Sequence, residues 1–136
     1  MKPRFLSPLI SEILTYKYCK LHEPFVYYSA ILKCIIKVPA EFVNDYESVP
    51  GIRGTSKRGG VVHDYLCRED SKPVVSKKVA ADVYSEAVKL SNQLRNKGKE
   101  SIVMMFKRYG KYWTVRVAPG YFHKHSVLAT YKEMSK

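Results

Sequence analysis

The hydrophobic residues of the N-terminal part form short runs rich in β-branched and aromatic side chains, which is the pattern of strands. Two such runs, Phe25–Ser29 and Ile31–Val38, follow each other around Ser29-Ala30 and predict a β-hairpin. An earlier run, Ile13–Cys19, would add a third strand. We therefore expect a small antiparallel sheet at the N-terminus.

Further along, apolar residues recur every three or four positions, which is the spacing of helices buried by one face. The run Val61–Arg68 fits a short helix. The run Ser76–Asn96 predicts a long one, because its apolar residues follow each other at steps of 4, 4, 3 and 4. Ser76 is expected to cap its first turn, and Asn96 with Gly98 to end it.

A last periodic segment begins after Ser101. Its apolar residues would share one face of a helix, and such a stripe is usually buried: Ile102, Met105, Phe106, Tyr109, Trp113 and Val117. The residues Tyr112–Val117 also alternate like a strand. We favour a helix to about Val117, with Gly110 as its weak point.

Strands first and helices afterwards indicate the α+β class. We expect an N-terminal β-hairpin or small antiparallel sheet followed by two or three packed helices, in one domain over residues 1–120. Residues 121–136 are expected to form a basic C-terminal tail. The segment Pro50–Gly60 has four glycines and one proline in eleven residues, which predicts a loop.

Composition narrows the class of protein. The chain has 136 residues, 46% of them hydrophobic, as in a folded globular domain. No apolar run approaches the roughly 18–20 residues of a membrane span, and Pro3, Pro8 and Glu12 interrupt any secretory signal. Its three cysteines include no CxxC pair, which favours reduced thiols in a protein made in a cytoplasm.

The chain is strongly basic, with 24 Lys+Arg against 12 Asp+Glu and a formal charge of +12. Residues 101–136 carry seven basic groups and one acidic group, which is half of that charge. Such a field attracts nucleic acid, an anionic envelope or an acidic protein. Four cations interleaved with aromatic residues are the candidates for binding nucleic acid or another partner: Lys107, Arg108, Lys111 and Arg116.

Nine of the twelve acidic residues lie between positions 41 and 100, around His63 and Asp64. An antiparallel pairing of the two predicted helices would bring Asp82 to His63, and a carboxylate there would orient the imidazole as a catalytic base. Asp64 and Asp45, with loop carbonyls, would offer oxygen ligands to Ca²⁺ or Zn²⁺. Supporting roles would fall to Ser48, Gly51, Gly54, Glu86 and Cys67. This set would suffice for metal-assisted attack of water on an ester or amide.

Each of these residues also has a purely structural interpretation. A His-Asp pair on a helix also serves as a cap or a packing contact, and Asp82 would pair equally well with Lys78 on the helix surface. Asp45 would also close an Asx-type turn. Cys67 fits a buried thiol, and a nucleophile pair with His63 is the alternative.

Three blocks carry a resemblance to a known family. They are V-P-A-E-F-V-N-D-Y-E-S-V-P at residues 38–50, V-V-H-D-Y-L at residues 61–66 and A-D at residues 81–82. The chain resembles an uncharacterised family of small tailed-bacteriophage and prophage proteins with the pattern V-P-x-G-F-x-T-D-x-A-S-V-P, then H-D-Y-L-Y, then A-D. It departs from this pattern at Asn44, Glu47 and Cys67.

A second similarity is to the His-Asp motif of phospholipases A2, in which a glycine-rich calcium loop precedes a helical H-D-x-x-Y. It implies His63 as the base, Asp64 as a calcium ligand, Asp82 as the orienting group and Gly51 and Gly54 in the loop. Cys67 stands at the position of the motif's tyrosine.

The resemblances imply a phage protein made in the host cytoplasm and incorporated into the virion or its tail, among other virion proteins. One expectation is a metal-assisted hydrolase aimed at the host envelope, with His63, Asp64 and Asp82 at its centre. The alternative is a non-catalytic structural or assembly protein in which the same residues stabilise the fold. Its basic C-terminus would then dock on a partner protein or nucleic acid.

Overall fold

The computed structural model describes residues 1–15, 18–44, 57–117 and 125–134. Its strands form two antiparallel three-stranded sheets, in the orders β1-β4-β5 and β2-β3-β6. The first sheet contains β1 (Arg4–Phe5), β4 (Phe25–Ser29) and β5 (Cys34–Val38). The second contains β2 (Ser11–Ile13), β3 (Cys19–Leu21) and β6 (Val43–Asn44).

Four helices lie among the described residues. They are α1 (Lys57–Leu66), α2 (Lys77–Arg95), α3 (Ile102–Val117) and the short α4 (Tyr131–Met134). The order of strands and helices confirms the predicted α+β class. None of these helices is both long and apolar enough to cross a bilayer.

The predicted hairpin is present, with two corrections to the strands. Its second strand begins at Cys34 rather than Ile31, because residues 30–33 form the turn and Lys33 has a positive φ of 54°. The run Ile13–Cys19 is not one strand. Its two ends belong to β2 and β3, which pair antiparallel with Ile13 opposite Cys19.

The long helix α2 has the caps that the sequence predicts. Ser76 Oγ accepts a hydrogen bond from the backbone N–H of Val79 at 3.2 Å. Asn96 is the C-terminal cap, and Gly98 has a φ of +88°, which glycine adopts without strain. The helix α1 starts before its predicted boundary, at Lys57, so residues 57–60 of the predicted loop are helical. Gly59 and Gly60 are buried in this first turn, where packing outweighs the low helix propensity of glycine.

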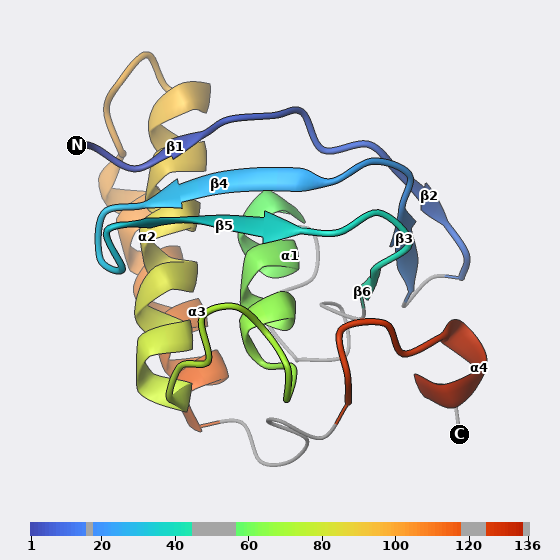
Figure 1. The fold of residues 1–136 in the computed structure, drawn as a ribbon. Coiled ribbons are helices and arrows are strands. Elements are labelled where there is room, and N and C mark those ends of the chain that lie inside the picture. Colours follow the sequence, from blue (N-terminus) through green and yellow to red (C-terminus); the bar gives the residue numbers. More distant parts are fainter. Residues whose placement is uncertain (16–17, 45–56, 118–124, 135–136) are drawn as a thin grey trace.

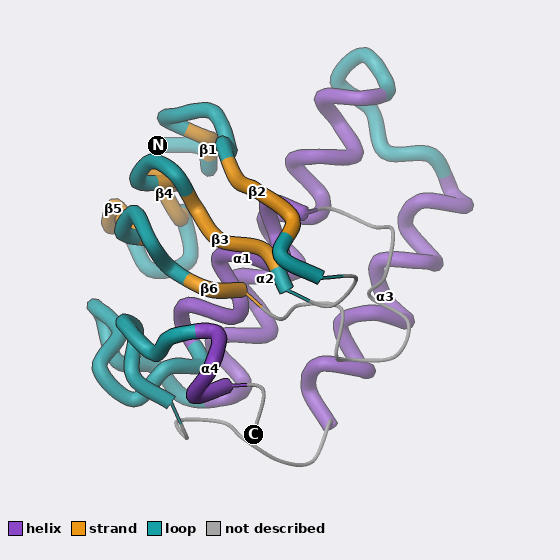
Figure 2. Tube along the Cα trace, turned by 90° about the vertical axis from the view of Figure 1, so that its right-hand side faces the viewer, coloured by secondary structure: helices purple, strands orange, loops and turns teal. Residues whose placement is uncertain are grey.

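The elements are arranged in layers (Figures 1 and 2). The strands lie on one side, α1 and α2 form the middle, and α3 lies on the opposite side, where it packs on α2. The main core is between the first sheet and α1 and α2, and is built from residues such as Phe25, Tyr27, Ile36, Leu66 and Val83. A smaller cluster joins α2 to α3 through Tyr84, Val88 and Val115.

The segment α3 is a helix to Val117, which settles the choice between helix and strand. Its apolar stripe, however, is not buried as expected. Phe106 and Trp113 are 67% and 59% exposed, and Met105 is half-buried. The opposite face, with Val115 and Arg108, packs on α2.

The predicted C-terminal tail lies on the domain over its described part, residues 125–134. Val127, Ala129 and Met134 are buried, and Met134 belongs to α4. The backbone N–H of Val127 donates to Asp70 Oδ1 at 2.6 Å. Residues 118–124 and 135–136 are outside the described part.

Candidate functional site

The polar residues of α1 begin with a buried ion pair. Arg68, just after the helix, donates from Nη2 to Asp64 Oδ2 at 3.0 Å. The two residues are 2% and 6% exposed. Burying two charges is tolerated only when they are paired and hydrogen-bonded, so Asp64 and Arg68 depend on each other.

The guanidinium of Arg68 also connects distant parts of the chain. Nη2 donates to the carbonyl of Val43 in β6 at 2.7 Å, and Nη1 donates to the carbonyl of Ser126 at 3.1 Å. Its carbon atom lies 4.6 Å from the centre of the Phe42 ring, a cation–π contact. Arg68 therefore joins α1, β6 and the C-terminal segment around one charge.

His63 lies on the side of α1 that faces α2. Its ring is 5.4 Å from that of Tyr84, edge to face, and its Nε2 is 3.6 Å from Cys67 Sγ. Burial lowers the pKa of His63 to about 4; nearby Asp64 opposes this shift and Lys77 adds to it. The imidazole is therefore neutral at pH 7.

Asp82 and Glu86 on α2 have other partners. Asp82 Oδ2 accepts from Lys78 Nζ at 2.8 Å, the surface pair that the sequence offered as an alternative. Glu86 accepts from the Tyr27 hydroxyl at 2.7 Å and from the backbone N–H of Ile31 at 3.0 Å. No hydrogen bond or ion pair within the described part of the chain joins His63 to Asp82.

The rest of the predicted set lies outside the described residues: Asp45, Ser48, Gly51 and Gly54. Within residues 1–15, 18–44, 57–117 and 125–134, no three His, Cys, Asp or Glu side chains are grouped so that they could hold a metal ion. The structure thus brings His63 together with Cys67 and Tyr84, Asp64 with Arg68, and Asp82 with Lys78.

Sequence reasoning missed Arg68, which is the centre of the buried network. One signal was present, because an acid four residues before a base on a helix forms a pair. The partners Val43 and Ser126 are 25 and 58 residues away from Arg68 along the chain. No local pattern marks them.

The comparison with protein families matches a large part of the chain. The family described as "Protein of unknown function (DUF1353)" matches residues 19–107, which is 89 of the 136 residues. The chain belongs to the DUF1353 family. The comparisons with curated proteins and with solved structures found no match. The part shared with the DUF1353 family runs from β3 into α3 and includes the Asp64–Arg68 pair.

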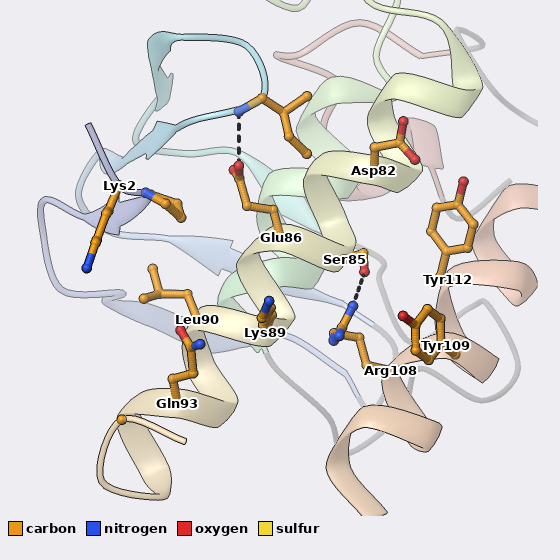
Figure 3. Close-up of a pocket in the computed structure, with 13 residues that line it drawn as sticks. Lys2, Asp82, Ser85, Glu86, Lys89, Leu90, Gln93, Arg108, Tyr109 and Tyr112 are labelled. Carbon is orange, nitrogen blue, oxygen red and sulfur yellow. Dashed lines mark hydrogen bonds between the residues drawn. The ribbon is translucent and has the colours of Figure 1, made fainter. Parts of the chain in front are cut away.

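A groove of about 800 Å³ lies between α2 and α3 of this DUF1353 protein (Figure 3). Asp82, Ser85 and Glu86 line it from α2, and Tyr109 and Tyr112 from α3. His63 and Cys67 are not among the residues that line this groove. Asp82, the predicted orienting acid, therefore lines the groove, whereas His63, the predicted base, does not.

Arg108, which lines this groove, holds α3 against α2. It donates to both carboxylate oxygens of Glu100 at 2.9–3.2 Å. From Nη1 it also donates to Ser85 Oγ at 2.9 Å (Figure 3). Burial raises the pKa of the Glu100 carboxyl, but hydrogen bonds from Arg108 and Asn92 outweigh it, so the pKa lies below its usual value. Glu100 therefore remains a charged anchor for α3.

The four cations proposed for binding differ in their positions. Arg108 is engaged with Glu100 and Ser85, whereas Lys107 is exposed and Arg116 half-buried. Lys111 is half-buried, and burial, with the neighbouring Lys107 and Arg95, lowers its pKa. A surface for an anionic partner would thus be built mainly from Lys107 and Arg116.

Proposed function

We propose that this DUF1353 protein is a non-catalytic component of a bacteriophage particle, in which the residues around His63 and Asp64 stabilise the fold. The observation that carries the structural, non-catalytic role is the buried pair of Asp64 and Arg68. The resemblance of the three sequence blocks to small proteins of tailed phages supports the origin.

The carboxylates of this region already have partners that stabilise the fold. Asp64 already neutralises a buried guanidinium, and removing that carboxylate to a metal would leave Arg68 buried without its anion. Glu86 likewise satisfies the Tyr27 hydroxyl and the turn between β4 and β5. Each carboxylate therefore has a task that folding requires.

The hydrolase is the second candidate, and one observation favours it. His63 is a neutral imidazole 3.6 Å from the Cys67 thiol, so it has a lone pair that can accept a proton. A general base works best when its pKa lies near the working pH, and a value of about 4 makes His63 a weak base at pH 7. For this reason we rank catalysis second.

Two measurements separate the candidates. The first assays the purified full chain on peptidoglycan and on anionic phospholipid, with Ca²⁺ and with Zn²⁺, beside His63→Gln and Asp64→Asn. The structural role predicts no turnover by any of the three proteins and a lower melting temperature for Asp64→Asn. Turnover by the wild type that a folded His63→Gln variant lacks would establish the hydrolase instead.

The second measurement looks for the protein in phage particles. Purified particles from an induced host carrying this gene are analysed by mass spectrometry, with a capsid protein as the internal standard. We expect peptides of this chain at a fixed ratio to that standard. Particles without them would refute the virion assignment, whatever the enzymatic result.

A further inference from the structure

The outward side of α3 carries six large apolar side chains in water. We call them the outer stripe: Ile102, Val103, Phe106, Tyr109, Trp113 and Val117. Each is at least 50% exposed, and five of them are 59–69% exposed. Tyr109, the least exposed, stands at the edge of the stripe and also lines the groove between α2 and α3. A contiguous apolar surface of this kind marks an interaction site.

The stripe is bordered by positive charge on both sides. At about 100° per residue, Lys107 and Arg116 lie about 180° apart around the helix, and the six stripe residues fall in the arc between them. The helix contains four basic residues and no acidic one. An apolar stripe with a cation at each border, and with aromatic residues in the stripe, is the pattern of a helix that lies in a membrane interface.

The helix is held ready for such a contact. Its inner side is fixed to α2 by Val115 and by the bond of Arg108 to Ser85. Arg108 also bonds Glu100, which accepts a hydrogen bond from Asn92 of α2. Figure 2 shows α3 as the outermost layer, on the side of the molecule away from the strands. Binding would therefore not require the helix to form first, which removes an entropic cost.

We propose that the outer stripe of α3 docks on an anionic lipid bilayer. The helix axis would lie parallel to the bilayer plane, with Phe106 and Trp113 among the acyl chains and Lys107 and Arg116 at the lipid phosphates. This inference goes beyond the proposed function and is independent of it, because it uses no residue of the His63 network.

Charge argues against the other occupants. A second copy placed on the stripe would bring its Lys107 and Arg116 against the same two cations of the first copy, without an acid on either α3 to pair with them. Nucleic acid would meet the cations but would leave the aliphatic side chains of the stripe in water, and its phosphates need many cations. An anionic bilayer satisfies the apolar and the basic parts together.

The sole tryptophan of the chain, Trp113, reports on the contact directly. The full-length protein is titrated with vesicles of phosphatidylglycerol and, separately, of phosphatidylcholine, at low and at high salt. We expect a blue shift of the tryptophan emission and co-sedimentation with phosphatidylglycerol, both much weaker with phosphatidylcholine. An unchanged emission and no co-sedimentation with phosphatidylglycerol at low salt would overturn the proposal.

A matched pair of variants tests the stripe itself. Phe106→Glu and Val74→Glu each add one negative charge at a position that is 67% or 64% exposed, but Val74 lies between α1 and α2. Both should fold, which circular dichroism verifies. We expect vesicle affinity at least about tenfold weaker for Phe106→Glu and nearly unchanged for Val74→Glu. If both variants lost vesicle affinity equally, the effect would come from net charge alone, and the proposal that the outer stripe contacts the bilayer would be refuted.

Two further outcomes would assign the stripe to another occupant. A wild-type dimer in sedimentation velocity, dissociated by Phe106→Glu and with no vesicle binding, would identify a second copy. Binding to DNA that Lys107→Gln weakens and Phe106→Glu leaves intact, again without vesicle binding, would identify nucleic acid. Either result refutes the lipid contact, and neither bears on whether His63 is catalytic.

Discussion

Arg68 and Asp64 are four residues apart in the chain, and a single guanidinium nitrogen of Arg68 bonds both the Asp64 carboxylate and the carbonyl of Val43. The charge that neutralises Asp64 thus also fixes β6 to the end of α1. Because the opposite guanidinium nitrogen bonds Ser126, loss of this one side chain would loosen three segments at once.

We expect Arg68→Met to destabilise the fold by about 3–5 kcal/mol, because it leaves Asp64 buried without its cation. The double variant Asp64→Leu/Arg68→Met should lose less than the single one, since both charges are gone. Urea unfolding followed by circular dichroism measures both. Lys78→Met is the control, because it breaks an exposed pair with the same spacing and should change little. A double variant that is less stable than Arg68→Met would contradict this account of the pair.

His63 makes stability depend on pH. Its pKa falls from 6.5 in the unfolded chain to about 4 in the folded one, so between these values the unfolded chain binds more protons. The contribution of His63 is complete above pH 6.5 and is lost as the pH falls toward 4, by at most about 3 kcal/mol.

The measurement compares urea midpoints at pH 8 and pH 5 for the wild type and for His63→Gln, which cannot be protonated. The wild type should lose more stability on acidification than the variant. Equal losses would mean that His63 is as easily protonated in the folded chain as in the unfolded one.

Glu86 fastens α2 to the hairpin. We expect Glu86→Ala to cost about 1–3 kcal/mol, because the Tyr27 hydroxyl loses its acceptor. Tyr27→Phe in the same background should restore part of the loss, since no buried hydroxyl then remains at that position. Thermal unfolding of the wild type and of these two variants gives the comparison. A loss that is identical with and without the hydroxyl would assign the effect of Glu86 to the Ile31 contact instead.

Arg108 determines how firmly α3 is held. Arg108→Ala removes the bonds to Glu100 and Ser85, so α3 should open more often while the sheets and α1 remain protected. Hydrogen exchange resolved by peptide measures this, with the amides of α1 as the internal control. Uniformly faster exchange in α1 and α3 would show that Arg108 supports the whole domain rather than one helix.

The sequence predicts those elements of the fold whose signal lies within a few neighbouring residues. The helix α2 follows from its apolar spacing, and its ends from Ser76, Asn96 and Gly98, because caps act within one turn. The hairpin strand Phe25–Ser29 follows from its β-branched and aromatic residues. These features need no knowledge of the rest of the chain.

The orientation of α3 could not be obtained in the same way. Periodicity locates the apolar side of a helix but does not say what covers it. The face toward α2 is held by Arg108, Glu100 and Ser85, and these bonds span 8 and 23 residues. The network around Asp64 could not be predicted for the same reason. Arg68 bonds backbone carbonyls in β6 and near the C-terminus, and no sequence pattern marks those distant positions.

The structural unit is larger than the family segment. Residues 19–107 exclude Phe5, whose ring packs at a tilt against Phe25 and Tyr27, and Val127, which is buried in the main core. They also exclude Ser126, whose carbonyl accepts a hydrogen bond from Arg68. A recombinant fragment trimmed to those boundaries would begin and end inside a hydrophobic interior and would be prone to aggregate, so cloning for any assay should retain both flanks.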